Sequence, residues 1–169
     1  MAYAALVDVH LILLRNGRLL LAERANTGFA DGLLNLPSGK LDPGEDLRAA
    51  VIREAREEIG LDLAPGAVRL VCVVHYRLAG HEPRIGCFFV ADDWTGEPVN
   101  AEPHKCAGLT WADPQDLPPR TVEYCAAGIH AYLDGVSYVA PGWDGGPKTG
   151  QTDQTGRDRS DRSDGSDRA

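Results

Sequence analysis

Residues 39–61 of this chain read GKLDPGEDLRAAVIREAREEIGL, and this stretch predicts a loop followed by a single helix. The segment from Asp46 to Ile59 is rich in residues with high helix propensity. Asp46 is placed to cap the N-terminus of the helix. Gly60 is placed to end it, because glycine adopts the left-handed conformation of a C-terminal cap without steric cost.

Three glutamates of this helix are expected to crowd together. Glu54, Glu57 and Glu58 are spaced i, i+3 and i+4, so they share one sector at the border of the apolar face. Arg53 and Arg56 are expected to point elsewhere, which leaves no basic residue of the helix among the carboxylates. Like charges at this spacing cost about 0.2–0.5 kcal/mol per pair. Such a cluster is either a solvated acidic face or a site for a hard divalent cation such as Mg²⁺ or Mn²⁺.

The complete pattern is G-x5-E-x7-R-E-U-x-E-E-x-G-U, where U is usually a bulky aliphatic residue. It resembles the Nudix box, the signature of hydrolases that cut diphosphate linkages with a divalent metal. Ala55 is smaller than the usual residue at its position, a departure that bears on helix packing and not on chemistry. Strand-like runs with two separated helices favour an α+β domain. The resemblance implies the Nudix α/β/α sandwich with a mixed sheet.

The resemblance also implies roles for individual residues. The positions that match the family's metal ligands are Gly39, through its carbonyl, and Glu54, Glu57 and Glu58. Glu57 or Glu58 would also help to activate the attacking water. Arg53 matches the arginine that orients the glutamates, and Glu45 matches an outer glutamate that orients the helix or other site groups. The implied cofactor is Mg²⁺, with Mn²⁺ as an alternative.

Substrate contacts are expected from two further segments. The run from Asn100 to Trp111, followed by Asp116-Leu117-Pro118, resembles the MutT-like nucleoside-triphosphate diphosphatases, in which the equivalent loop lies beside the nucleobase pocket. Glu102 and Lys105 are therefore candidate substrate contacts. Glu102 has two alternative interpretations, as an additional metal carboxylate or as a surface charge of the loop.

Asn35 and Lys40 are the other candidates. Asn35 lies four residues before Gly39, where some MutT-like enzymes place an asparagine that contacts the base; the alternative is a hydrogen bond at a turn or strand end. Gly39-Lys40 is not part of a P-loop, because Leu41 follows where Ser or Thr is needed. Lys40 is then either a phosphate contact or a surface lysine. The histidines, including His10, show no ligand spacing.

Composition restricts the partners and the compartment. The chain of 169 residues has a formal net charge of −8 and no basic block, which argues against nucleic-acid polymers and anionic membrane surfaces as partners. An acidic protein that binds a polyphosphate needs metal ions between the two sets of negative charge. Four widely spaced cysteines favour a reducing compartment. With no apolar run of 18 residues and no leader, we expect a cytoplasmic protein.

The remaining pattern predicts how the chain is organised. Strands are expected at 7–15, 18–23, 33–36, 68–78, 84–91 and 107–111, a helical turn at 114–117 and a second helix at 122–133. Asn16-Gly17 predicts a two-residue hairpin turn between the first two strands. Residues 1–143 are expected to form the Nudix domain. Residues 144–169 are expected to be a disordered polar tail, because they contain too few apolar side chains to offset chain entropy.

These observations favour one function and leave two alternatives. The expected reaction is metal-dependent hydrolysis of a nucleoside triphosphate to the monophosphate and diphosphate, by a monomer or a homodimer. One alternative is a diphosphatase for ADP-ribose or a nucleotide sugar. The other is a non-catalytic nucleotide-sensing domain, against which the intact Glu54, Glu57 and Glu58 argue, since a sensor needs no groups that activate water.

Overall fold

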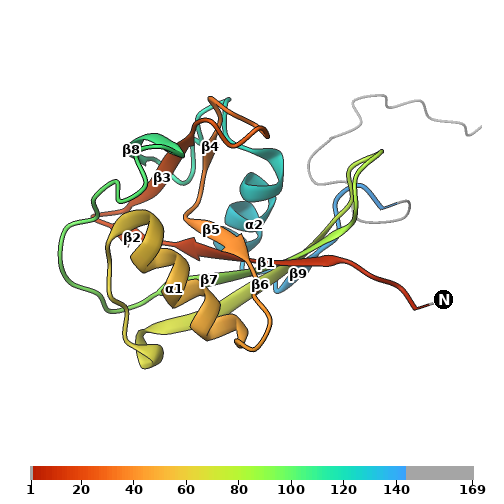
Figure 1. The fold of residues 1–169 in the computed structure, drawn as a ribbon, viewed down its shortest axis with the longest axis horizontal. Coiled ribbons are helices and arrows are strands. Elements are labelled where there is room, and N and C mark those ends of the chain that lie inside the picture. The colour runs from red at the N-terminus through yellow and green to blue at the C-terminus, as the bar shows by residue number, and fades with distance from the viewer. Residues whose placement is uncertain (1, 144–169) are drawn as a thin grey trace, which may run out of the picture.

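The computed structural model describes residues 2–143 and, within them, a five-stranded sheet that forms the centre of the fold (Figure 1). Its strand order is β5 (Ser38–Lys40), β1 (Leu6–Ile12), β7 (Arg84–Ala91), β6 (Val68–Tyr76) and β9 (Tyr138–Val139). β1 and β7 are parallel, as are β6 and β9, whereas the other pairs are antiparallel. The predicted mixed sheet is therefore confirmed.

A second, smaller sheet is built around β3 (Arg18–Arg24). β3 pairs with β8 (Cys106–Ala112) along one edge, and with β2 (Leu14–Arg15) and β4 (Leu34–Asn35) along the other. The prediction of one continuous strand over residues 7–15 is wrong. The chain leaves the first sheet after Ile12 and enters the second at Leu14, with Leu13 fully buried between them. A run of apolar residues does not reveal where a strand changes partners.

The predicted turn and helix signals are largely confirmed. Asn16 and Gly17 have φ values of 51° and 74°, as a type I′ hairpin turn requires. Asp46 caps the start of α1 (Leu47–Ile59): its Oδ1 accepts hydrogen bonds from the backbone amides of Arg48 and Ala49, each at 2.8 Å. Gly60 ends α1 with a φ of 67°.

The segment after β8 differs from the prediction. The expected helical turn at 114–117 is a tight turn instead, closed by a 3.2 Å hydrogen bond from the Asp116 amide to the Asp113 carbonyl. The second helix, α2 (Glu123–Leu133), begins near its predicted start. A single 3₁₀ turn, η1 (Pro65–Ala67), precedes β6.

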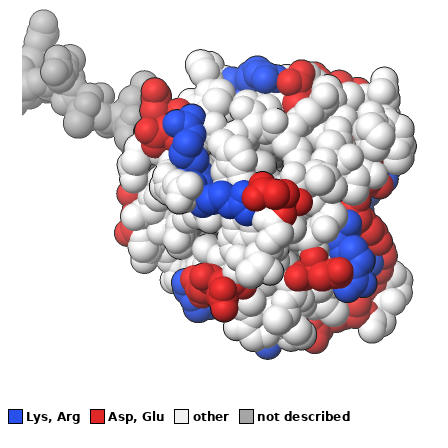
Figure 2. All heavy atoms as spheres, turned by 90° about the vertical axis from the view of Figure 1, so that its left-hand side faces the viewer, with Lys and Arg blue, Asp and Glu red and all other residues white. Residues whose placement is uncertain are grey.

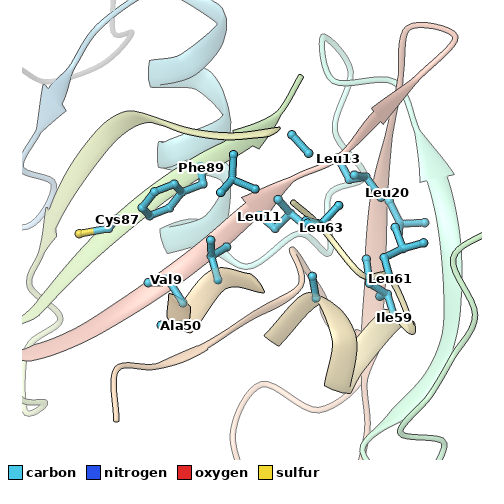
Figure 3. Close-up of a cluster of buried hydrophobic side chains, with 14 residues drawn as sticks. Val9, Leu11, Leu13, Leu20, Ala50, Ile59, Leu61, Leu63, Cys87 and Phe89 are labelled. Atoms are coloured by element: carbon cyan, nitrogen blue, oxygen red, sulfur yellow. The ribbon is translucent and has the colours of Figure 1, made fainter. Parts of the chain in front are cut away.

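The two helices cover opposite faces of the five-stranded sheet (Figure 1). Val9, Leu11 and Phe89 pack beneath α1 in one buried cluster, which Figure 3 shows in close-up. Phe88 packs in a separate cluster that contains Ile129 of α2, because successive side chains of a strand point to opposite faces. Ala55 is fully buried in the first cluster, so the small residue at this position is part of the core. This arrangement confirms the predicted α+β sandwich.

The predicted tail, residues 144–169, lies outside the residues that the structure describes. No helix among the described residues is both long and apolar enough to cross a membrane.

Candidate active site

A cavity of about 760 Å³ opens where the β5 edge of the large sheet meets α1, β3 and three loops. It collects eight of the residues singled out in the sequence. They are Asn35, Gly39, Lys40, Glu54, Glu57, Glu58, Glu102 and Lys105. Arg53 and Glu45 are not among the lining residues; Arg53 contacts Glu54 of the cavity wall and is itself bound by Glu45. The structure therefore brings the predicted metal-binding and substrate-binding residues to one place.

Arg53 connects the loop and the helix of the box. Its Nη2 donates to Glu45 Oε1 at 2.6 Å and to the Lys40 carbonyl at 3.1 Å. Its Nη1 donates to Glu54 Oε1 at 2.7 Å and to Glu57 Oε2 at 3.3 Å. The expectation that no basic residue of the helix lies among the glutamates is wrong. Arg53 and Glu57 are spaced i and i+4, so they are neighbours on the helix surface, and the same guanidinium also reaches Glu54.

Glu54 is the buried member of the cluster. Its residue is 9% exposed, and a Cβ atom at Gly39 would collide with its carboxylate. Gly39 is thus needed for the close approach of β5 and α1, because only glycine leaves that space free. Burial raises the pKa of Glu54, while the adjacent Arg53 guanidinium acts in the opposite direction.

Glu58 lies one helical turn further along and is half-buried. The Ser38 amide donates a 2.8 Å hydrogen bond to Glu58 Oε2, which ties the helix to β5 a second time. Burial raises the pKa of Glu58 to about 8, and the negative charges of Glu54 and Glu102 add to the effect. Glu57, by contrast, is exposed at the cavity wall.

The loop that carries Glu102 is fixed on the C-terminal end of α1. The Val99 and Ala101 amides donate to the carbonyls of Ile59 and Glu58 at 3.0 and 3.1 Å. These bonds satisfy carbonyls that the end of a helix leaves without partners. They also place Glu102 beside the α1 carboxylates, where its Oε1 accepts a 2.8 Å hydrogen bond from Lys105 Nζ. The two predicted substrate contacts in this loop therefore pair with each other.

The donor set fits a hard divalent cation. Carboxylate oxygens from Glu54, Glu57 and Glu58 are the ligands that Mg²⁺ and Mn²⁺ take. Burial is the main cause of the raised pKa values of Glu54 and Glu58, and the negative charges of neighbouring carboxylates add to it. Within residues 2–143, no three acidic, histidine or cysteine side chains converge as a finished metal cage. Arg53 binds one oxygen of each of Glu54 and Glu57, which leaves Glu54 Oε2 and Glu57 Oε1 available to a cation.

The floor of the cavity contains residues that sequence reasoning missed. Arg84 Nη1 donates to both oxygens of the buried Asp8, at 2.7 and 2.6 Å, and the Tyr124 hydroxyl lies 3.5 Å from Asp8 Oδ2. His10 lies two residues along β1 and also lines the cavity. The available signal was the spacing of Asp8 and His10, two polar residues at i and i+2 within an otherwise apolar strand.

Comparison with known proteins agrees with this geometry. Residues 5–133 match the family model described as the NUDIX domain. The chain belongs to the Nudix hydrolase family. The MutT NUDIX hydrolase from Burkholderia pseudomallei has a crystal structure similar to this one, with a TM-score of 0.68 and 30% sequence identity. That match covers 75% of this chain and 97% of the other.

Two Escherichia coli K12 proteins are similar in sequence to this Nudix hydrolase. CTP pyrophosphohydrolase is 30% identical over 105 residues, which cover 62% of this chain and 73% of the relative. 8-oxo-dGTP diphosphatase is 28% identical over 115 residues, which cover 67% of this chain and 87% of the relative. These similarities make the chain a MutT-like Nudix hydrolase, and Nudix hydrolases generally act with divalent metal ions.

The raised pKa of Glu58 predicts how stability depends on pH when divalent metal is chelated. The ordinary glutamate pKa is 4.5 and the folded pKa of Glu58 is about 8, so between these pH values Glu58 binds a proton in the folded chain but not in the unfolded chain. The pKa of His10 is lowered from 6.5 to about 3, so His10 acts in the opposite direction below about pH 6.5. The free energy of unfolding is therefore expected to fall as pH rises from about 6.5 to about 8. Urea unfolding in EDTA across this range measures the slope.

Glu58→Gln is expected to flatten this slope, because an amide does not titrate. The same exchange at Glu123, an exposed residue of α2, controls for the loss of one negative charge. An equally steep decline in Glu58→Gln and wild type would show that Glu58 is not the group responsible.

Proposed function

We propose that this protein hydrolyses a diphosphate linkage in a nucleotide, with Mg²⁺ as cofactor, and that its substrate is a nucleoside triphosphate cleaved to the monophosphate and diphosphate. The observation that carries the proposal is the shared cavity. The box glutamates and Glu102 line part of it, and the polar and aromatic side chains of β1 and α2 line another. Its volume of about 760 Å³ is within the usual range for a small-molecule site.

In this proposal, one group of residues binds the cation and another contacts the phosphates. Glu54, Glu57 and Glu58, with the carbonyl of Gly39, would hold the cation, which lowers the pKa of water and neutralises phosphate oxygens. Arg53 orients the glutamates from its anchor on Glu45. Glu57 or Glu58 accepts a proton from the attacking water. Lys40 and Lys105 are exposed residues of the cavity lining, and their ammonium groups would contact phosphate oxygens.

The choice of a nucleoside triphosphate is supported by the relatives. One is named for action on CTP and the other for action on 8-oxo-dGTP. Charge also favours a small ligand over a nucleic-acid polymer, since the chain is acidic overall. On the face drawn in Figure 2, acidic and basic side chains lie next to one another instead of forming a separate basic patch.

Removal of a metal carboxylate should abolish most turnover without unfolding the protein. Glu57→Gln and Glu58→Gln are each expected to lower kcat by about 100-fold or more, because transition-state charge stabilisation of several kcal/mol is lost. Release of monophosphate and diphosphate from a panel of nucleoside triphosphates, followed by chromatography with Mg²⁺ present, measures the effect. Asp93→Asn, at an exposed position outside the cavity lining, serves as the charge-matched control.

Wild-type turnover in both box variants would remove these residues from the active site. A wild-type protein that releases no diphosphate from any nucleotide, yet binds nucleotides, would instead support the nucleotide-sensing alternative.

The base end of the site is tested separately. Asn35→Ala and Glu102→Ala are expected to change the ranking of kcat/KM among purine and pyrimidine triphosphates, while Mg²⁺ dependence persists. A lost hydrogen bond that leaves a buried partner unpaired costs about 1–3 kcal/mol. If both variants keep the wild-type ranking, these residues do not read the base. Complete loss of activity in Glu102→Ala alone would identify Glu102 as a metal or catalytic carboxylate.

A further inference from the structure

We propose that His10 reads the nucleobase together with Asn35, and that this pair favours bases that carry an exocyclic amino group over bases that lack one. The inference rests on the proposed function, because it assigns the part of the cavity beyond the box glutamates to the base. It adds a specificity-determining residue and a substrate class to that function.

His10 is a buried polar residue without a polar partner. It is 4% exposed, and neither Nδ1 nor Nε2 has a hydrogen-bond partner within the described residues. Its ring stacks on Phe88 with centroids 4.3 Å apart and meets the edge of Tyr124 at 5.0 Å. Buried polar groups in folded proteins are nearly always hydrogen-bonded, so two unpaired ring nitrogens on a cavity wall indicate a ligand that pairs with them.

Asn35 supplies a second unpaired group on the same wall. It is 9% exposed, and its Nδ2 donates a 2.9 Å hydrogen bond to Ser38 Oγ. That bond leaves Oδ1 buried without a partner. Ser38 is the register partner of His10 across the β1–β5 pair. Asn35 is therefore held against the residue that faces His10, and both side chains line the one cavity.

The other polar groups of the floor are already engaged. Both oxygens of Asp8 accept hydrogen bonds from Arg84. The hydroxyl of Tyr124 lies against Asp8, and the hydroxyl of Tyr76 contacts Glu123 at 3.4 Å. Among the floor residues named here, His10 and Asn35 are therefore the ones with unpaired hydrogen-bonding groups.

The protonation state of His10 determines which hydrogen bonds its ring nitrogens can make. Burial, with a smaller effect from the charge of Arg84, lowers the pKa of His10 to about 3. The imidazole is neutral near pH 7, so it offers one donor and one acceptor. With Asn35 Oδ1, the free set is two acceptors and one donor.

Bases differ in how well they complement this set. Cytosine offers two amino hydrogens and the ring acceptor N3, whereas uracil offers a single N–H donor between two carbonyl oxygens. Guanine likewise has an amino group that hypoxanthine lacks. Uracil and hypoxanthine therefore leave an acceptor of the site unpaired, and an unpaired buried acceptor weakens binding on the order of ten-fold.

Binding of nucleoside monophosphates tests the inference without requiring turnover. The full chain is titrated with CMP, UMP, GMP and IMP in Mg²⁺ by calorimetry. The expected result is binding of CMP and GMP about ten-fold tighter than UMP and IMP, respectively. His10→Phe keeps the aromatic stack on Phe88 but removes both ring nitrogens, so it should bring the CMP-to-UMP ratio toward one. His10→Gln retains a donor and an acceptor and should keep most of the preference.

Controls separate base reading from packing. His10→Phe should melt at or above the wild-type temperature, because it removes two unpaired buried polar atoms. His130→Phe makes the same exchange at an exposed position of α2 outside the cavity lining and should leave the ratio unchanged. Equal binding of CMP and UMP by the wild type, a ratio unaltered in His10→Phe, or an equal effect of His130→Phe would each overturn the assignment.

Two experimental outcomes distinguish base reading by His10 from the proposed hydrolysis. A chain that cleaves no nucleoside triphosphate but prefers CMP through His10 would refute the proposed function and keep the inference. A chain that cleaves CTP and UTP equally, with a binding ratio insensitive to His10→Phe, would do the reverse.

Discussion

Repulsion among three carboxylates within little more than one turn of α1 is the constraint on which the site depends. The Arg53 guanidinium offsets it by donating to Glu54 and Glu57 from one side. Arg53 is in turn held by Glu45, in the loop before the helix, and by the Lys40 carbonyl at the end of β5. The spacing of the whole box therefore has one physical purpose: the loop positions an arginine, and the arginine positions the glutamates.

The same helix organises the rest of the cavity. Gly39 allows β5 to approach Glu54, and the Ser38 amide binds Glu58. The carbonyls at the C-terminal end of α1 hold the loop that carries Glu102. The cation end of the site is thus built on α1, whereas the floor is built on β1 and α2. A nucleotide bound across both would place its phosphates at one and its base at the other.

Features set by local chemistry were predictable from the sequence. The caps of α1 at Asp46 and Gly60 and the Asn16-Gly17 turn each depend on a few neighbouring residues, and all three are confirmed. The box pattern also identified residues that the fold brings to one cavity. Features set by pairing over long distances were not predictable. The break between β1 and β2, the short β5 and β9 strands and the Asp8–Arg84 pair depend on partners far along the chain.

Arg53 and His10 show what could be predicted at the level of single side chains. The contact of Arg53 with Glu57 was predictable, because the two residues are spaced i and i+4, whereas its bonds to Glu45 and the Lys40 carbonyl depend on how the preceding segment folds. His10 has no motif around it, and only the structure shows that it lines the cavity and that its buried nitrogens have no hydrogen-bond partner among the described residues.

The central claim is that the α1 glutamates and Gly39 hold the catalytic cation. A crystal structure with Mn²⁺ and a non-hydrolysable nucleoside triphosphate tests it most directly, because anomalous scattering identifies the metal. The account predicts a Mn²⁺ peak about 2.0–2.3 Å from oxygens of Glu54 and Glu58 and from the Gly39 carbonyl, with Arg53 still bound to Glu54. A Mn²⁺ ion bound only by nucleotide oxygens, with none of these three protein groups among its ligands, would contradict it.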